Sequence, residues 1–147
     1  MEKAGWLEDA VAAMRFAREI EGVNPEHIVA IGSSIGADGA ADACERINEE
    51  FPGTCQGSLS LSPGDYLDVS YTVTMIKMGS LKEPTIAWCL ADENEYGVCE
   101  AAEAAANPAV YKAFLIPDGS HGNMLLRPDL DPLPMQLILD FLEETLQ

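Results

Sequence analysis

A buried strand, a tight turn and a helix follow one another between residues 28 and 43, and no other stretch constrains the fold as strongly. The segment Ile28–Ile31 is short, apolar and rich in β-branched residues, which is typical of a strand buried on both faces. Residues 32–36, with the sequence GSSIG, interrupt this strand, and an Ala-rich segment with helical spacing follows. The stretch therefore predicts a strand–turn–helix unit.

Ser34 lies at the centre of this turn, in the pattern Gly-x-Ser-x-Gly. Between a strand and a helix, such a strained turn lifts the hydroxyl above the sheet edge, and the glycines leave room for the neighbouring elements. The helix that begins at Ile35 aims its free N–H groups at the same point, where they could stabilise an oxyanion. Ser34 is thus the candidate nucleophile, and the Ile35 N–H is the candidate oxyanion donor.

Two other interpretations of the turn compete with a nucleophile. Gly-x-Ser-x-Gly also occurs by chance, because a Gly/Ser turn can join any strand to any helix. A phosphate-binding loop fits less well, since the turn lacks Gly-Lys-Ser/Thr and its glycines do not follow the Gly-x-Gly-x-x-Gly spacing.

Apolar patterns along the rest of the chain alternate between helix and strand. Helices are expected over 7–22, from 35 to about 48, over 97–106 and from Pro132 onward, and strands over 28–31, 57–61, 85–91 and 111–116. Residues 66–78 have no clean periodicity and are expected to form a loop with a short helix. The alternation predicts an α/β fold, a parallel sheet of about four strands with helices on both faces. Residues 1–147 should form one domain.

The composition limits the partners and the location of the protein. A net charge of −17, from 25 acidic and 8 basic residues, makes nucleic acid and anionic membranes poor partners. We find no secretory signal, and no apolar run approaches the ~20 residues that span a bilayer. The four cysteines contain no Cys-x-x-Cys pair, so we expect reduced thiols in a cytoplasmic protein.

Residues whose side chains could act in catalysis follow each of the predicted strands. In a parallel α/β sheet, ligands bind beyond the carboxyl ends of the strands, and here those ends carry Ser34, Ser62, the acidic residues 92–95 and His121. A serine nucleophile needs a base, which in turn needs an acid to orient it. His121 lies on the correct side for this role, whereas His27 precedes the first strand and is expected to be structural. The two unrelated histidines and the scattered cysteines offer no metal-ligand spacing, so no metal is expected.

Four motifs in register carry a family resemblance. They are residues 32–37 (GSSIGA), residues 61–64 (LSPG), the strand and acidic segment that ends at Tyr96, and residues 120–122 (SHG). In this order they resemble the carboxyl-terminal half of an α/β-hydrolase, closest to the dienelactone hydrolase-like branch with a serine nucleophile. The resemblance covers nearly the whole chain and identifies it as a single truncated α/β-hydrolase-like domain.

The resemblance implies an activity and a set of roles. Ser34 would be the nucleophile, His121 the general base, and the Ile35 N–H one oxyanion donor. The implied protein is a small, carboxylesterase-like serine hydrolase that acts on short esters or thioesters through an acyl-enzyme, without a cofactor. The family's usual position for the acid, counted from Ala91, falls on Asn94, which cannot stabilise a positive imidazole. We therefore expect Asp92 to be the acid, with Glu93 or Asn94 as alternatives.

The chain also departs from the family. It supplies only the later strands of an α/β-hydrolase, without the loop that donates the second oxyanion N–H. The strand at Ile28 would then have an unpaired apolar edge, which invites pairing with another chain. We expect a homodimer or larger oligomer that covers this edge, or else a separate polypeptide that carries the missing half. The alternative to an enzyme is a weak or inactive half-hydrolase that serves as a binding or assembly module.

Overall fold

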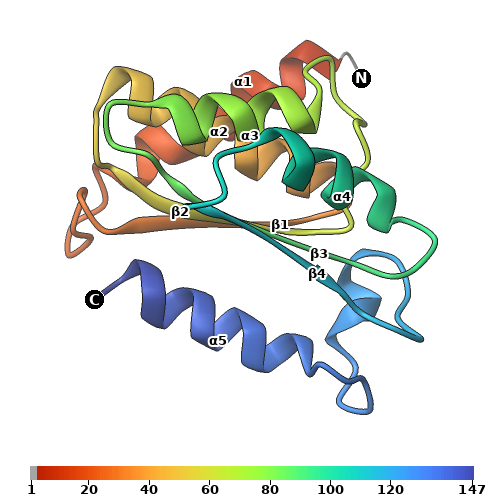
Figure 1. Cartoon of the computed structure of the whole chain (residues 1–147). Coiled ribbons are helices and arrows are strands. Elements are labelled where there is room, and N and C mark those ends of the chain that lie inside the picture. The colour runs from red at the N-terminus through yellow and green to blue at the C-terminus, as the bar shows by residue number, and fades with distance from the viewer. Residues whose placement is uncertain (1–2) are drawn as a thin grey trace.

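Four parallel strands and their flanking helices form the fold of residues 3–147, the part of the chain that the computed structural model describes (Figure 1). The helices are α1 (Lys3–Ala17), α2 (Ile35–Glu50), α3 (Tyr71–Ser80), α4 (Tyr96–Ala105), the 3₁₀ helix η1 (Gly122–Leu126) and α5 (Pro134–Thr145). The strands are β1 (Ile28–Ser33), β2 (Cys55–Leu61), β3 (Ile86–Ala91) and β4 (Tyr111–Leu115). The predicted α/β fold with a four-stranded parallel sheet is confirmed.

The order of the strands in the sheet is the order of the chain, β1-β2-β3-β4, and all three pairs are parallel. Helices α1 to α4 lie on one side of the sheet and α5 lies on the other (Figure 1). Because right-handed crossovers between successive neighbours all return over the same face, α2, α3 and α4 must share that face. The carboxyl ends of the four strands therefore meet at one edge.

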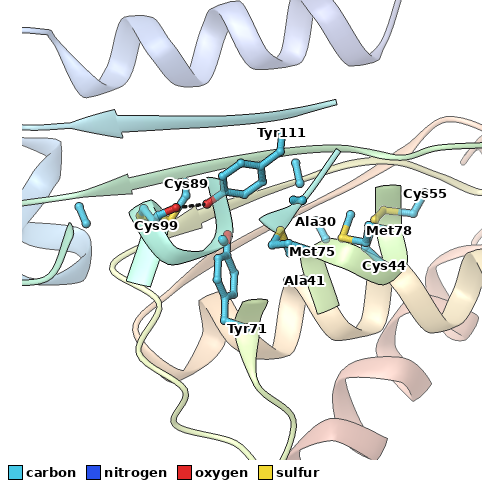
Figure 2. Close-up of a cluster of buried hydrophobic side chains, with 14 of the residues drawn as sticks. Ala30, Ala41, Cys44, Cys55, Tyr71, Met75, Met78, Cys89, Cys99 and Tyr111 are labelled. Carbon is cyan, nitrogen blue, oxygen red and sulfur yellow. Dashed lines mark hydrogen bonds between the residues drawn. A yellow bond between two sulfur atoms is a disulfide. The ribbon is translucent and has the colours of Figure 1, made fainter. Parts of the chain in front are cut away.

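The larger part of the core lies between the sheet and the helices α2, α3 and α4 (Figure 2). Small strand residues such as Ala30 and Ala87 face this layer, which lets larger helical side chains such as Ile47 and Met78 pack directly on the sheet. Inside the layer, the buried hydroxyl of Tyr111 donates to the carbonyl of Cys99 at 3.1 Å (Figure 2). That bond ties β4 to α4.

The opposite face of the sheet packs against α5. Leu59, Trp88 and Leu90 are buried there around Phe141, and the rings of Trp88 and Phe141 are 5.7 Å apart. A Cβ atom at Gly57 would meet the Phe141 ring, so the absence of a side chain lets α5 approach β2 closely. The amphipathic helix predicted from Pro132 onward begins at Pro134, and it supplies the helix on the second face of the sheet.

Two disulfides show that the prediction of reduced thiols was wrong. Cys44 of α2 is bonded to Cys55 at the start of β2, and Cys89 of β3 is bonded to Cys99 of α4. The Cα atoms in these pairs are 5.4 and 5.6 Å apart, within the range of a disulfide. Helix packing on the strands brings the partners together, and no short spacing rule detects this. Since disulfides persist in oxidising environments, the cysteines no longer argue for a cytoplasmic protein.

Most element boundaries fall near the predicted ones, and the first helix differs. The helix expected over 7–22 spans Lys3–Ala17 instead, and the chain continues through tight turns in which Glu19 donates to Phe16 and Ile20 to Ala17. Gly22, with φ of 88°, ends these turns rather than the helix. Within residues 3–147, no helix is both long and apolar enough to cross a lipid bilayer.

Candidate functional site

Ser34 occupies a strained turn between β1 and α2. Its φ of 57° and ψ of −130° lie outside the regions that non-glycine residues favour. The turn is fixed by its surroundings, because the Ser34 N–H donates to Leu61 at 2.9 Å and its carbonyl accepts from Ala37 at 2.8 Å. A Cβ atom at Gly32 would collide with the Gly36 carbonyl, so this glycine permits the close approach of strand and helix. The structure thus has the elbow geometry that the Gly-x-Ser-x-Gly pattern predicts.

The loop after β4 brings His121 to the elbow. His121 Nε2 lies 2.7 Å from Ser34 Oγ, although the two residues are 87 positions apart. The following residue, Gly122, has φ of 57°, and its N–H donates to the Ser62 hydroxyl at 2.9 Å. A side chain at Gly122 would also run into the Ser33 hydroxyl. Ser62, at the end of β2, therefore anchors the histidine loop.

Glu95 provides the carboxylate on the other side of the imidazole. Its Oε1 lies 2.6 Å from His121 Nδ1, so hydroxyl, imidazole and carboxylate form one continuous chain. Glu95 is the residue before α4, and its φ of −114° and ψ of −8° place it in the sparsely populated bridge region where many active-site residues lie. Its side chain is 28% exposed, against 46% for His121.

The acids expected at this position have other contacts. Asp92 is buried, and its Oδ1 accepts the backbone N–H groups of Asn94 and Glu95, each at 3.1 Å. Glu93 accepts the N–H of Asp118 at 3.0 Å, in the loop that leads to His121. The structure therefore places Glu95 against His121, in place of Asp92 and its alternatives Glu93 and Asn94.

The sequence contains a signal for this difference. Aspartate directly after a strand commonly accepts from N–H groups two and three residues later, which is the behaviour of a turn or capping residue. Asp92 is such a residue, because its carboxylate accepts two backbone N–H groups of the turn. A longer glutamate at the end of that turn can then reach the histidine. If Asp92 is interpreted as a capping residue, Glu95 becomes the candidate for the acid that contacts His121.

The first turn of α2 carries the candidate oxyanion donor, the Ile35 N–H. The first N–H groups of a helix have no partner within that helix. Ile35 is the first residue of α2 and follows Ser34 directly in the sequence, so its N–H is one of these groups. The positive end of the helix dipole lies at the same place.

Tyr66, which the sequence did not identify, lies beside His121 at the elbow. Its ring meets the His121 ring edge to face, with centroids 6.3 Å apart and an interplanar angle of 88°. Burial raises the pKa of the Tyr66 hydroxyl, the charges of Glu95 and Asp38 raise it further, and a hydrogen bond with the Ser34 side chain opposes the rise. Burial and the neighbouring charges therefore favour the neutral phenol over the phenolate.

An open apolar groove of about 640 Å³ lies beside the elbow. It runs between α1 and β1 and reaches α2, and its lining includes Trp6, Met14, Ile31, Ile35 and Leu67. Ile31 of β1 is 43% exposed there. His27, at the opposite end of β1, is exposed in a turn, where its ring contacts Asn24, far from this edge of the sheet.

Comparisons with known proteins agree with the fold. No protein-family description matches the chain, and a search of curated proteins finds no match. Among solved structures, the chain is similar to EstE1, a thermophilic and thermostable carboxylesterase cloned from a metagenomic library, with a TM-score of 0.65 and 16% identity. The match covers 96% of this chain and 63% of that one. The chain thus has an α/β-hydrolase-like fold similar to that of the carboxylesterase, and it spans less than two thirds of that protein's length.

Proposed function

We propose that this protein is a small serine hydrolase of the carboxylesterase type, with Ser34, His121 and Glu95 as its catalytic triad. The observation that carries the proposal is the continuous chain from Ser34 Oγ to His121 Nε2, 2.7 Å, and from His121 Nδ1 to Glu95 Oε1, 2.6 Å. A nucleophile and base within hydrogen-bond reach, with the base oriented by a third group, form the arrangement that acyl transfer needs.

The triad would act in two steps on a short ester or thioester. Ser34 Oγ attacks the carbonyl carbon while its proton passes to His121 Nε2, and the carbonyl oxygen takes up the electron pair as an oxyanion. The C–O or C–S bond then breaks, and the leaving group takes the proton from His121. Water deprotonated by His121 attacks the acyl-enzyme in the same way and releases the acid. Glu95 stabilises the imidazolium in both steps.

The similarity to a carboxylesterase supports this class of reaction through the fold alone, because the two sequences are only 16% identical. We also propose that the chain belongs to the dienelactone hydrolase-like branch, and the sequence motifs around Ser34, Ser62 and His121 support this assignment.

The experiment is labelling with a fluorophosphonate probe, followed by hydrolysis of p-nitrophenyl acetate. The native protein should label stoichiometrically, and Ser34→Ala and His121→Ala should each abolish labelling and turnover. Ser33→Ala is the matched control, because it removes a neighbouring hydroxyl that is not hydrogen-bonded to His121. A native protein that is folded by circular dichroism but does not label would contradict the proposed activity.

The second candidate is a binding or assembly module. The exposed edge of β1 and the apolar groove beside it favour this function, since an unpaired apolar strand edge pairs readily with another chain. An unlabelled but folded protein that forms stable oligomers would support it over the hydrolase.

A further inference from the structure

We propose that the Tyr66 hydroxyl is an oxyanion donor, which works together with the Ile35 N–H on the carbonyl oxygen of the substrate. This inference rests on the proposed function and adds a catalytic residue to it. In α/β-hydrolases the second donor is a backbone N–H from a loop far before the nucleophile. A side-chain hydroxyl from the loop after β2 would be a different solution.

The first argument is the position of the phenol. The Tyr66 ring stands edge to face on the His121 ring, with 6.3 Å between centroids, and His121 Nε2 lies 2.7 Å from Ser34 Oγ, so the phenol belongs to the immediate surroundings of Ser34. In the tetrahedral adduct, one carbon atom separates the oxyanion from Ser34 Oγ. A donor beside Oγ is therefore within reach of the oxygen that becomes charged. Hydrogen-bond donors at such a site stabilise the transition state more than the substrate.

The second argument is that the loop is held rigidly at this place. Asp38, which lies one turn after Ser34 on α2, is 4% exposed, and its carboxylate accepts the N–H of Tyr66 at 2.6 Å and that of Gly64 at 3.3 Å. Asp65 accepts the N–H of Tyr71 at 2.6 Å and so closes the other side of the loop. The helix that carries the nucleophile thus also fixes the backbone that carries the phenol.

The third argument comes from Gly64. A Cβ atom at this position would collide with the Tyr66 ring, so the ring lies directly against the glycine backbone. The contact with Gly64 therefore restricts the orientation of the Tyr66 side chain. Preorganised donors of this kind need no reorganisation during the reaction, which is the source of their effect. Asp38 and Gly64 act on the oxyanion through Tyr66, and they are positioning residues.

Tyr66→Phe tests the inference, because it removes the hydroxyl and keeps the ring. We expect kcat for p-nitrophenyl acetate to fall about 10²-fold with little change in KM, the usual cost of one oxyanion donor. Affinity for a trifluoromethyl ketone, which forms an oxyanion adduct with the serine, should fall in the same proportion. Tyr96→Phe is the matched control, because it removes the hydroxyl of a half-buried tyrosine that packs on the core.

Asp38→Asn provides a second, independent variant. It weakens the anchor of the loop and should lower kcat, whereas the double variant with Tyr66→Phe should lose no more than Tyr66→Phe alone, since both changes act through one hydroxyl. Losses that multiply would overturn the coupling between Asp38 and Tyr66.

The outcomes separate this inference from the proposed function. An active native protein with Tyr66→Phe at native kcat, or with only KM raised, would overturn the role of Tyr66 and leave the triad intact. A folded native protein that neither labels nor turns over substrate would overturn the proposed hydrolase and the role of Tyr66 together. Thermal melts of each variant would establish that the fold is kept.

Discussion

Glu95 Oε1 lies 2.6 Å from His121 Nδ1, and Asp92 accepts the N–H of the same glutamate at 3.1 Å. The carboxylate on the imidazole and the carboxylate that shapes the turn are therefore different residues. This division of roles means that charge removal at each acid of the 92–95 cluster should have a different effect.

Glu95→Gln should be the most damaging of these changes. An amide keeps the size of the side chain but cannot stabilise the imidazolium, and the corresponding change in a serine protease costs about 10⁴-fold in kcat. Glu93→Gln keeps an oxygen for the Asp118 N–H and should lose far less. The measurement is kcat on p-nitrophenyl acetate for both variants, with the exposed Glu100→Gln as control. A larger loss at position 93 than at 95 would refute the assignment of the acid.

Glu45 should make the protein less stable as the pH rises. Its side chain is 1% exposed, and burial raises its pKa to about 7, opposed by Lys77 and reinforced by Glu49 and Asp42. Between about pH 4.5 and 7 the folded state holds a proton that the unfolded chain has released, so the free energy of unfolding falls with rising pH in this window. At about 1.4 kcal/mol for each pKa unit, the cost above pH 7 is at most about 4 kcal/mol.

Glu45→Gln should therefore raise the melting temperature at pH 8 and change it little at pH 4. Differential scanning calorimetry across this range checks the prediction. Glu143→Gln, an exposed change on α5, serves as the control and should not alter the pH dependence. Equal stabilisation at both pH values would contradict the buried-carboxylate explanation.

The disulfide between Cys89 and Cys99 should support activity as well as stability. It closes the segment that contains Asp92 and Glu95, whereas the bond between Cys44 and Cys55 lies elsewhere. Each loop closure contributes roughly 2–3 kcal/mol. The double variants Cys89→Ala/Cys99→Ala and Cys44→Ala/Cys55→Ala should both melt earlier, but only the first should lower kcat below the melting range. Equal kcat in the two variants would contradict the idea that the disulfide between Cys89 and Cys99 helps to position Glu95.

A second copy of this chain should cover the free edge of β1. Ile31 is 43% exposed on that edge, beside the apolar groove. Sedimentation should give at least twice the 15.8 kDa of one chain, and Ile31→Glu should return the protein to a monomer. Because each copy carries a net charge of −17, association should strengthen as salt screens the repulsion. A single monomeric species at every concentration and salt level would rule out self-association.

Local patterns in the sequence determine much of this structure. The apolar strand at Ile28 and the turn around Ser34 predict the elbow, because both signals depend on neighbours in the chain. The alternation of helices and strands predicts the parallel sheet, and parallel topology places the loop of His121 at the correct edge. These predictions rest on neighbouring residues in the sequence and do not require any contact between distant side chains to be known.

Contacts between distant segments were not predictable in the same way. The use of the Asp92 carboxylate within its own turn is a local signal, but the contact between Glu95 and His121, 26 residues apart, depends on how the loop after β4 folds. Tyr66 lies in a segment without periodicity, and its place depends on Asp38 from another element. The cysteine pairs likewise depend on how α2 and α4 pack on the sheet.

The sequential order of the strands has a consequence for how the protein is made. From β2 to β4, each strand pairs with the strand that was synthesised just before it, so this part of the sheet can grow by one strand at a time. Ser34 precedes His121 by 87 residues, and the loop that carries His121 follows β4. A growing chain therefore carries Ser34 before His121, and the two side chains can meet only after β4 has been made.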